Sequence, residues 1–441
     1  MVNHELILAH LQDQVADLAL HRNRFAELTD EEWLFFLQQI EGYQRTKDKL
    51  PTFASLNSKL STLTSPWWYP VRLSCEQCSS EATARYKAQL VVGQRHLIDL
   101  TGGAGVDTFF MGEQMETVDY VERDAELCRL ARHNLPDKVR VHNKTAEAIL
   151  FNANANVNVN ANANVNENQT LNTIHQTPDT VIYIDPARRD KNGGKVFRIE
   201  DCTPNVVELL PQMRQIADTI LIKFSPMLDI SAALCRLNGP WQVHVVAVKN
   251  EVKEVIFNTN VNVNANVNAN DNVNVNANVN DNVNVNGGSI RAVDLEEGWQ
   301  FEFTQEEEEQ TISRLANYPI SQGYIYEPNA AILKAGAYKL VGARYGLNKL
   351  DTNTHLYHSE QFVQDFPGRI FKIADGTRTV HTPYSIRERS ERSKFNVLTR
   401  NYVMGAEELK KKLKVRDGGT QFIIGARHNG KPIMLLCDRI K

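Results

Sequence analysis

The chain has 441 residues, enough for two to four domains, and its apolar content of 42% supports a buried core. No apolar run reaches the roughly 18 residues that a membrane helix needs, and the start of the chain does not have the pattern of a signal peptide. Composition thus argues against a membrane-spanning protein. We expect a cytoplasmic protein with reduced thiols.

The net charge of −4 is unevenly distributed. Residues 369–416 hold 13 Lys/Arg and 5 Asp/Glu, which leaves 36 and 48 elsewhere, a net charge of −12. A basic segment on an acidic chain favours a polyanionic partner such as RNA, with tRNA and rRNA as the expected kinds. The alternative is an ordinary solvated surface.

The first 75 residues follow a helical pattern. Leu6, Leu8, Leu11, Val15 and Leu18 are spaced at a helical period. A capping box, Thr29-Asp-Glu-Glu32, opens a further helix that we expect to end before Lys49-Leu-Pro51. Residues 1–75 are therefore a predicted helical region without evident chemistry.

Residues 76–258 alternate between short apolar runs and helical patterns, as in a doubly wound α/β sheet. Seven strands are expected, and the last two follow each other without a helix. The predicted strands are Leu97–Leu100, Thr117–Val121, Val139–His142, Thr180–Ile184, Thr219–Ile222, Gln242–Val248 and Glu254–Phe257.

Two segments, 152–168 and 258–286, alternate Asn with Val or Ala. Asn is a poor strand former, and chains with few large apolar residues cannot offset the entropy of ordering. We predict a disordered insertion within the α/β domain and a disordered linker (259–286) after it. An assembly role for these repeats is the alternative.

Beyond the second repeat, Ser289–Asp294 and Trp299–Phe303 are predicted strands, and Glu306–Glu309 is predicted to begin a solvated helix. A different α+β module is expected to start at Tyr324 and to run to Lys441.

A glycine cluster follows the first predicted strand, in the segment Asp99-Leu-Thr-Gly-Gly-Ala-Gly105. Glycine lets the backbone turn tightly and approach a ligand, and the following helix presents backbone N–H groups. Glu122 ends the next strand, where a carboxylate can accept the hydroxyls of a ribose. Asp185-Pro186 repeats the strand-then-turn pattern.

This spacing favours S-adenosylmethionine (AdoMet) as the cofactor. The pattern is not G-x-G-x-x-G, and an acid before the glycines suits the AdoMet ammonium better than a pyrophosphate. A dinucleotide site and a sheet that binds no ligand are the alternatives. The expected cofactor-binding residues are Asp99, Thr101, Gly102, Gly103, Gly105, Glu122, Arg123, Asn143, Asp185 and Pro186.

Several segments together resemble the bacterial class I methyltransferases that carry a THUMP-like C-terminal domain, a family typical of the Bacteroidota. They are Cys78–Lys87, Asp99–Gly105, Tyr183–Arg189, Ile222–Asp229 and Glu327–Gly336. The resemblance implies a Rossmann-like seven-stranded catalytic domain (76–258), a ferredoxin-like domain (287–323) and a THUMP-like domain (324–441). It also implies RNA as the substrate, since THUMP domains bind structured RNA.

The acceptor atom is less well defined. Asp185-Pro-Ala-Arg188 has no aromatic to stack on a flipped base, and Ile222-Lys-Phe-Ser-Pro226 has no thiol for covalent catalysis. Transfer to an RNA base is the leading prediction. Arg188 and Arg189 are candidates for holding a phosphate or for structural ion pairs.

A second hypothesis rests on four charged residues near predicted strand ends, Lys87, Asp185, Lys223 and Glu254. Their order resembles the tetrad of FtsJ-type ribose 2′-O-methyltransferases, in which Lys223 would be the base, Asp185 and Glu254 would position it and Lys87 would assist. Structural ion pairs are the alternative role. A small-molecule or protein methyltransferase, and an RNA-binding protein without catalysis, remain open.

Six cysteines are present, and only Cys75 and Cys78 are closely spaced. A structural zinc site needs a second ligand pair, which is not evident, so no metal is expected.

Overall fold

The computed structural model describes residues 4–58, 66–151, 179–187, 198–259, 288–317, 319–374 and 394–441. All of the first Asn-rich segment and the second beyond Thr259 lie outside the described residues, as do Arg188 and Arg189. Two compact units are formed, one from the described parts of 1–241 and 256–279 and the other from those of 242–255 and 280–441.

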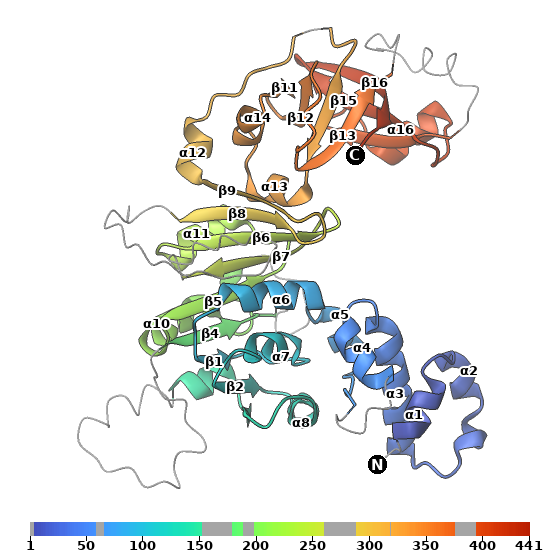
Figure 1. Ribbon diagram of the computed structural model, residues 1–441, viewed down its shortest axis with the longest axis vertical. Helices are drawn as coiled ribbons and strands as arrows, with labels where there is room; N and C mark the ends of the chain where they lie inside the picture. Colours follow the sequence, from blue (N-terminus) through green and yellow to red (C-terminus); the bar gives the residue numbers. More distant parts are fainter. Residues whose placement is uncertain are drawn as a thin grey trace. The chain divides into compact units, whose positions relative to one another are not determined.

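The N-terminal region is helical, as predicted, and is drawn in blue in Figure 1. Thr29 and Glu32 form the expected capping box, in which the Thr29 hydroxyl accepts from the Glu32 N–H. The elements are α1 (His4–His10), α2 (Val15–Leu20), the 3-10 helix η1 (Arg22–Phe25), α3 (Asp30–Thr46), α4 (Pro51–Ser58) and α5 (Arg72–Gln77).

The first sheet has nine strands in the order β3-β2-β1-β4-β5-β7-β6-β8-β9. Their bounds are β1 (His96–Asp99), β2 (Thr117–Glu122), β3 (Val139–Asn143), β4 (Thr180–Ile184), β5 (Thr219–Phe224), β6 (Gln242–Val248), β7 (Glu251–Asn258), β8 (Ser289–Asp294) and β9 (Trp299–Thr304). The seven predicted strands are all present. β1 lies centrally and pairs in parallel with β2 and β4, so their carboxyl ends lie at one edge of the sheet.

The helices of the first unit beyond α5 are α6 (Glu81–Leu90), α7 (Val106–Gly112), α8 (Ala125–Asn134), η3 (Ile199–Asp201), α10 (Val206–Ile216) and α11 (Ile230–Leu237). Asp124, Asn205 and Asp229 cap α8, α10 and α11 through their side-chain oxygens. Such caps satisfy N–H groups that have no partner within the helix. These caps therefore determine the residue at which each of the three helices begins.

β8 and β9 correct one expectation. Residues 287–323 were expected to form a separate domain, whereas β8 pairs in parallel with β6 and antiparallel with β9 as part of the first sheet. Without β8, the edge of β6 would expose unpaired backbone groups. The sheet is therefore longer than the seven strands expected.

The remaining elements form a second sheet of order β11-β12-β10-β13-β16-β15-β14 with its helices. They are α12 (Gln305–Gln310), β10 (Tyr324–Pro328), α13 (Ala330–Ala335), α14 (Leu340–Arg344), β11 (Asn348–Asp351), β12 (Thr354–Ser359), β13 (Gly368–Ile373), β14 (Asn396–Arg400), α16 (Ala406–Leu413), β15 (Gln421–His428) and β16 (Lys431–Arg439).

Asn329, inside one of the segments that carried the family resemblance, is a structural residue. Its side chain is fully buried, caps α13 and donates to Asp294 Oδ2 at 2.8 Å. Asn250, in the turn between β6 and β7, accepts from the Ala330 N–H at 2.7 Å. The segment therefore joins α13 to the β6–β8 strands.

Candidate functional site

The glycine turn lies between β1 and α7. The Gly102 N–H donates to the Val121 carbonyl at 3.0 Å, and a Cβ at Gly102 would meet the Tyr120 ring at 2.1 Å. Gly103 and Gly105 adopt φ angles of +55° and +76°, which L side chains rarely adopt. All three glycines are thus required by the backbone, for contact or for conformation.

Asp99 lies at the floor of this turn and is 1% exposed. Its carboxylate accepts from the Thr101 N–H at 3.0 Å and from the Thr108 hydroxyl at 2.5 Å. Burial raises the pKa of Asp99 to about 7, and the charges of Asp107 and Asp185 act in the same direction. The hydrogen bonds from Thr108 and Thr101 only partly oppose this shift. A cation beside Asp99 would favour the ionised carboxylate and would be attracted by its charge.

Glu122 lies beside the turn at the end of β2. One carboxylate oxygen accepts from the Gly103 N–H at 3.0 Å and the other from the Asp124 N–H at 2.9 Å. Each carboxylate oxygen has a further lone pair for a ligand hydroxyl. Asn143, at the end of β3, donates to the carbonyls of Glu122 and Arg123 at 3.0 Å. Asn143 therefore holds the backbone at Glu122 and Arg123, two other residues that are predicted to bind the cofactor.

The turn after β4 is tied to the glycine turn. The Asp185 N–H donates to the Thr101 hydroxyl at 2.7 Å, and Pro186 follows as a buried residue. The Asp185 carboxylate forms an ion pair with Lys223, from β5. The structure thus brings the predicted residues Asp99, Thr101, Asp185 and Lys223 to one sheet edge.

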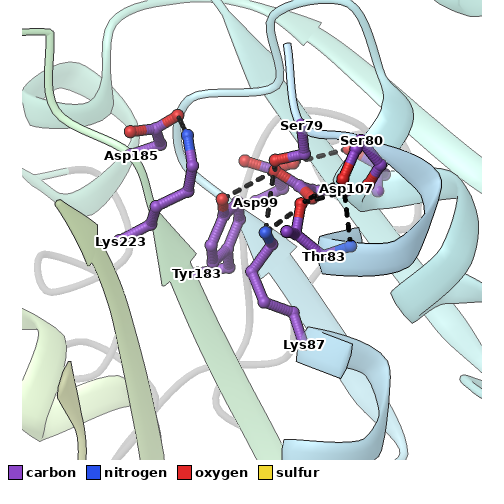
Figure 2. A network of polar contacts seen from close by, with 10 residues as sticks. Ser79, Ser80, Thr83, Lys87, Asp99, Asp107, Tyr183, Asp185 and Lys223 are labelled. Carbon is purple, nitrogen blue, oxygen red and sulfur yellow. Dashed lines mark hydrogen bonds and ion pairs between the residues drawn. The ribbon is translucent and has the colours of Figure 1, made fainter. Parts of the chain in front are cut away.

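A second polar network lies next to this pair (Figure 2). Lys87, on α6, has no exposed side-chain surface and lies 3.2 Å from Asp107 Oδ1. Asp107 Oδ2 accepts from the Ser79 hydroxyl at 2.8 Å and from the Tyr183 hydroxyl at 2.7 Å. Burial alone would raise the pKa of Asp107, but the charges of Lys87 and Lys223 lower it. The carboxylate therefore stays ionised.

Sequence analysis missed Asp107, Ser79 and Tyr183. Asp107 is the second residue of α7, a position where a carboxylate is favoured by the helix dipole. That position is the one signal that could have drawn attention to it. Ser79 and Tyr183 carried no such signal, because serines before helices and tyrosines within strands are common.

Glu254 was expected to be the first residue of its strand, and the structure places it further along. It is the fourth residue of β7, which begins at Glu251, and is 2% exposed. It is therefore a residue of the strand interior and does not open the strand.

The basic segment 369–416 contains structural cations. Arg369 and Arg400 both form ion pairs with Glu327, which is 1% exposed, and Lys410 pairs with Glu407 and Asp417. Phe395, an aromatic residue of this segment, is buried in a core with Leu409 and Leu413, and Tyr402 packs against this core. Neither residue is therefore free to stack on a base. Among the described residues of this segment, the exposed cations outside these ion pairs are Lys372, Lys394, Lys411, Lys412, Lys414 and Arg416.

The C-x-x-C pair is part of the packing. Cys75 is 2% exposed and donates to the Pro70 carbonyl, and burial raises the pKa of its thiol to about 12. Within the described ranges, no three His, Cys, Asp or Glu residues are grouped as a metal site would need. In the same ranges, no helix is long and apolar enough to cross a membrane.

Comparison with known proteins places these features in context. Residues 324–367 match a family model described as a ferredoxin-like domain, and residues 368–439 match one described as THUMP domain-like. The ferredoxin-like match thus begins where the THUMP-like domain was expected. No curated protein matches the chain.

Among solved structures, the chain is similar to the "putative methyltransferase from Porphyromonas gingivalis W83", with 29% identity over 99% of this chain and 97% of that chain and a TM-score of 0.75. A "SAM Dependent Methyltransferase from Agrobacterium tumefaciens" matches at 11% identity over 40% of this chain and 59% of that chain, with a TM-score of 0.27. The "putative methyltransferase yhhF from Escherichia coli" matches at 15% identity over 44% and 94%, with a TM-score of 0.27.

The chain therefore combines the class I methyltransferase fold with a ferredoxin-like and a THUMP-like domain. The fold class and the family resemblance expected from the sequence are confirmed. The site residues remain predictions.

Proposed function

We propose that this protein is an AdoMet-dependent methyltransferase that transfers a methyl group to a base of a structured RNA. The observation that carries this proposal is the meeting of Asp99, Glu122 and Asp185 around one glycine turn. The similarity to the Porphyromonas gingivalis protein over nearly the whole of both chains supports methyl transfer. The THUMP-like match supports RNA as the substrate.

The residues of this edge fit the proposed cofactor. Asp99 is a buried carboxylate whose ionisation an ammonium would favour, and Glu122 keeps acceptor capacity for ribose hydroxyls. The turn leaves no room for side chains at Gly102. When bound, AdoMet would supply the activated methyl group. Thr101 and Asp185 would then form the wall of its site.

Ribose 2′-O-methylation is a second candidate, because one specific contact favours it. Lys223 and Asp185, two members of the proposed tetrad, form an ion pair (Figure 2). Lys87, a third member, contacts Asp107 and Ser79. This arrangement suits a positioning role for Lys87 within the protein core better than a role in proton transfer.

Mass spectrometry of tRNA and rRNA nucleosides from a deletion strain and its parent tests the proposal. We expect one methylated base to be missing in the deletion strain and restored by the wild-type gene but not by an Asp185→Asn variant. A missing 2′-O-methylated nucleoside would establish the second candidate instead. Unchanged RNA nucleosides would count against an RNA substrate.

Lys223→Ala, with Lys253→Ala as control, tests the tetrad. If Lys223 is the base, the variant loses transfer but retains AdoMet binding by calorimetry. Lys253 is a partly exposed lysine that pairs with Glu251 on its own strand. Full activity of Lys223→Ala on the identified RNA would contradict the tetrad.

A further inference from the structure

A cavity of about 230 Å³ lies in the second unit, far along the chain from the glycine turn. It is formed by the segment 312–314, which follows α12, and by α14 with the start of β11. The polar residues that line it are Ser313, Arg314, Lys339, Asn348, Lys349 and Tyr357. Three of these are cations, and no carboxylate lines the cavity. The lining is therefore suited to an anion.

The three cations that line the cavity are Arg314, Lys339 and Lys349. Within the described parts of the chain, none of them forms an ion pair. Lys339 Nζ donates to the Glu309 carbonyl and Lys349 Nζ to the Thr352 carbonyl, both at 2.7 Å. An ammonium has three donors, so each lysine retains donors for a ligand.

Lys349 carries an electrostatic cost in the protein without a ligand. It is 5% exposed, and burial lowers its pKa, with Lys339 acting in the same direction. Glu308 and Asp351 oppose this shift. The Glu308 carboxylate already accepts from the N–H groups of Lys339 and Leu340, at 2.8 and 2.9 Å. A bound anion would remove the remaining cost.

Shape also fits a compact ligand group. Gly346 lines the cavity at a φ of +65°, and a Cβ there would meet no atom within 4 Å. The backbone at this corner is thus open to close approach. Ser313 and Asn348 add neutral donors beside the cations. Multiple donors around a small space are typical of sites for phosphate groups.

We propose that this cavity binds a phosphate group, held by Arg314, Lys339 and Lys349. Free nucleotides and RNA both present such a group, and the choice of probes distinguishes these two sources. This inference is independent of the proposed methyl transfer, because it concerns a separate cavity and a binding event only.

Calorimetric titration of the full chain tests the proposal with two pairs of probes. The first pair is adenosine 5′-monophosphate and adenosine. The second is a short RNA oligonucleotide with a 5′-phosphate and the same oligonucleotide with a 5′-hydroxyl. The variant is Arg314→Gln/Lys339→Gln, which leaves the buried Lys349 in place. The control is Lys372→Gln, an exposed lysine on β13 that does not line the cavity.

We expect the phosphorylated member of at least one pair to bind more tightly than its partner. The double variant should weaken that binding about tenfold to a hundredfold, as for the loss of charge-assisted hydrogen bonds. Lys372→Gln should leave it unchanged. Binding of the free nucleotide would identify a small-molecule ligand, and phosphate-dependent binding of the RNA pair alone would identify an RNA end.

Two results would overturn the proposal. One is equal binding within both pairs by the wild-type protein. The other is an equal loss in Lys372→Gln and in the double variant, which would indicate general attraction to a basic surface. Both readouts are independent of methyl transfer, so they separate this proposal from the proposed function.

Discussion

The ammonium of Lys87 lies 3.2 Å from Oδ1 of Asp107, and the Lys87 side chain is fully buried. Lys87 belongs to α6 and Asp107 to the first turn of α7, so the pair joins two helices that pack together. Tyr183 and Ser79 complete the contacts of the carboxylate. Because α7 follows the glycine turn directly, this pair fixes the base of the proposed cofactor site.

Replacing Lys87 with Met should strongly destabilise the first unit. The substitution keeps the volume of the side chain but leaves the Asp107 carboxylate buried without its cation. Breaking a buried ion pair from one side costs about 3–5 kcal/mol. Urea unfolding monitored by tryptophan fluorescence measures this loss, because Trp33, Trp67, Trp68 and Trp241 all lie in the first unit.

A control for this variant is Arg95→Gln. Arg95 pairs with Glu116, and both side chains are about 60% exposed. Exposed pairs contribute little to stability, because water and salt screen the two charges. If Lys87→Met costs no more than Arg95→Gln, the buried pair does not stabilise the unit as argued.

The fold could be predicted from the sequence because its signals are local. Apolar runs at 97–100 and 180–184 have lengths typical of buried strands, and Thr29 and Glu32 specify a helix start. The extension of the sheet by β8 and β9 depends instead on pairing with β6 across a long insertion. Such pairing is not encoded in any local pattern.

In the candidate site, too, local features could be predicted from the sequence and long-range contacts could not. The meeting of Asp99, Glu122 and Asp185 at one edge could be predicted, because Asp99 and Glu122 end their parallel strands and Asp185 follows β4. The partners of charged residues could not. The sequence predicts that Lys87 assists Lys223 in the tetrad, whereas its contact with Asp107 depends on how α6 packs on α7.

Stability should depend on pH through Asp99. The pKa of this carboxyl is about 7 in the folded protein and near 3.8 otherwise, so the folded state holds the proton more tightly. The free energy of unfolding should therefore fall as pH rises from about 4 to 7, by at most about 1.4 kcal/mol per pH unit. Urea unfolding across this range, compared with Asp99→Asn, isolates this contribution.

The Asp99→Asn variant provides the reference for this test. Asn does not titrate, so the wild-type protein should lose stability relative to Asp99→Asn as the pH rises. A constant difference between the two proteins would mean that Asp99 is ionised throughout. If AdoMet is the cofactor, its affinity for the wild-type protein should rise over the same range, because the ionised carboxylate is the form that binds an ammonium.

Gly102→Ala should damage the glycine turn. The new Cβ would lie 2.1 Å from the Tyr120 ring, which is buried and whose hydroxyl donates to the Gly103 carbonyl. Overpacking of this kind costs about 1–3 kcal/mol, and AdoMet binding should be lost as the turn shifts. Thermal unfolding and calorimetry measure both effects. Gly405→Ala is a suitable control, since a Cβ there meets no atom within 4 Å; equal behaviour of the two variants would contradict the argument.

Glu327→Gln should loosen the second sheet. Glu327 is 1% exposed and forms ion pairs with Arg369 of β13 and Arg400 of β14. The substitution leaves two partly exposed cations without their carboxylate. The cost should be below the value of about 3–5 kcal/mol for breaking a fully buried pair, because water screens the two guanidinium groups. Hydrogen–deuterium exchange should speed up in β13 and β14. Glu407→Gln, which removes an exposed pair with Lys410, should leave these strands unchanged. Unaltered exchange in Glu327→Gln would show that the pairs add no stability.

Three exposed lysines at the end of α16 offer a test of RNA binding by the second unit. Lys411, Lys412 and Lys414 carry no ion pair in the described part of the chain and lie close together in the basic segment 369–416. If they neutralise RNA phosphates, replacing all three with Gln should reduce the slope of log K against log salt by about 2–3. Filter binding of total tRNA over a range of salt concentrations measures this slope. Lys253→Gln, which lies outside the basic segment, should preserve it, and a triple variant with the wild-type slope would place the RNA-binding surface elsewhere.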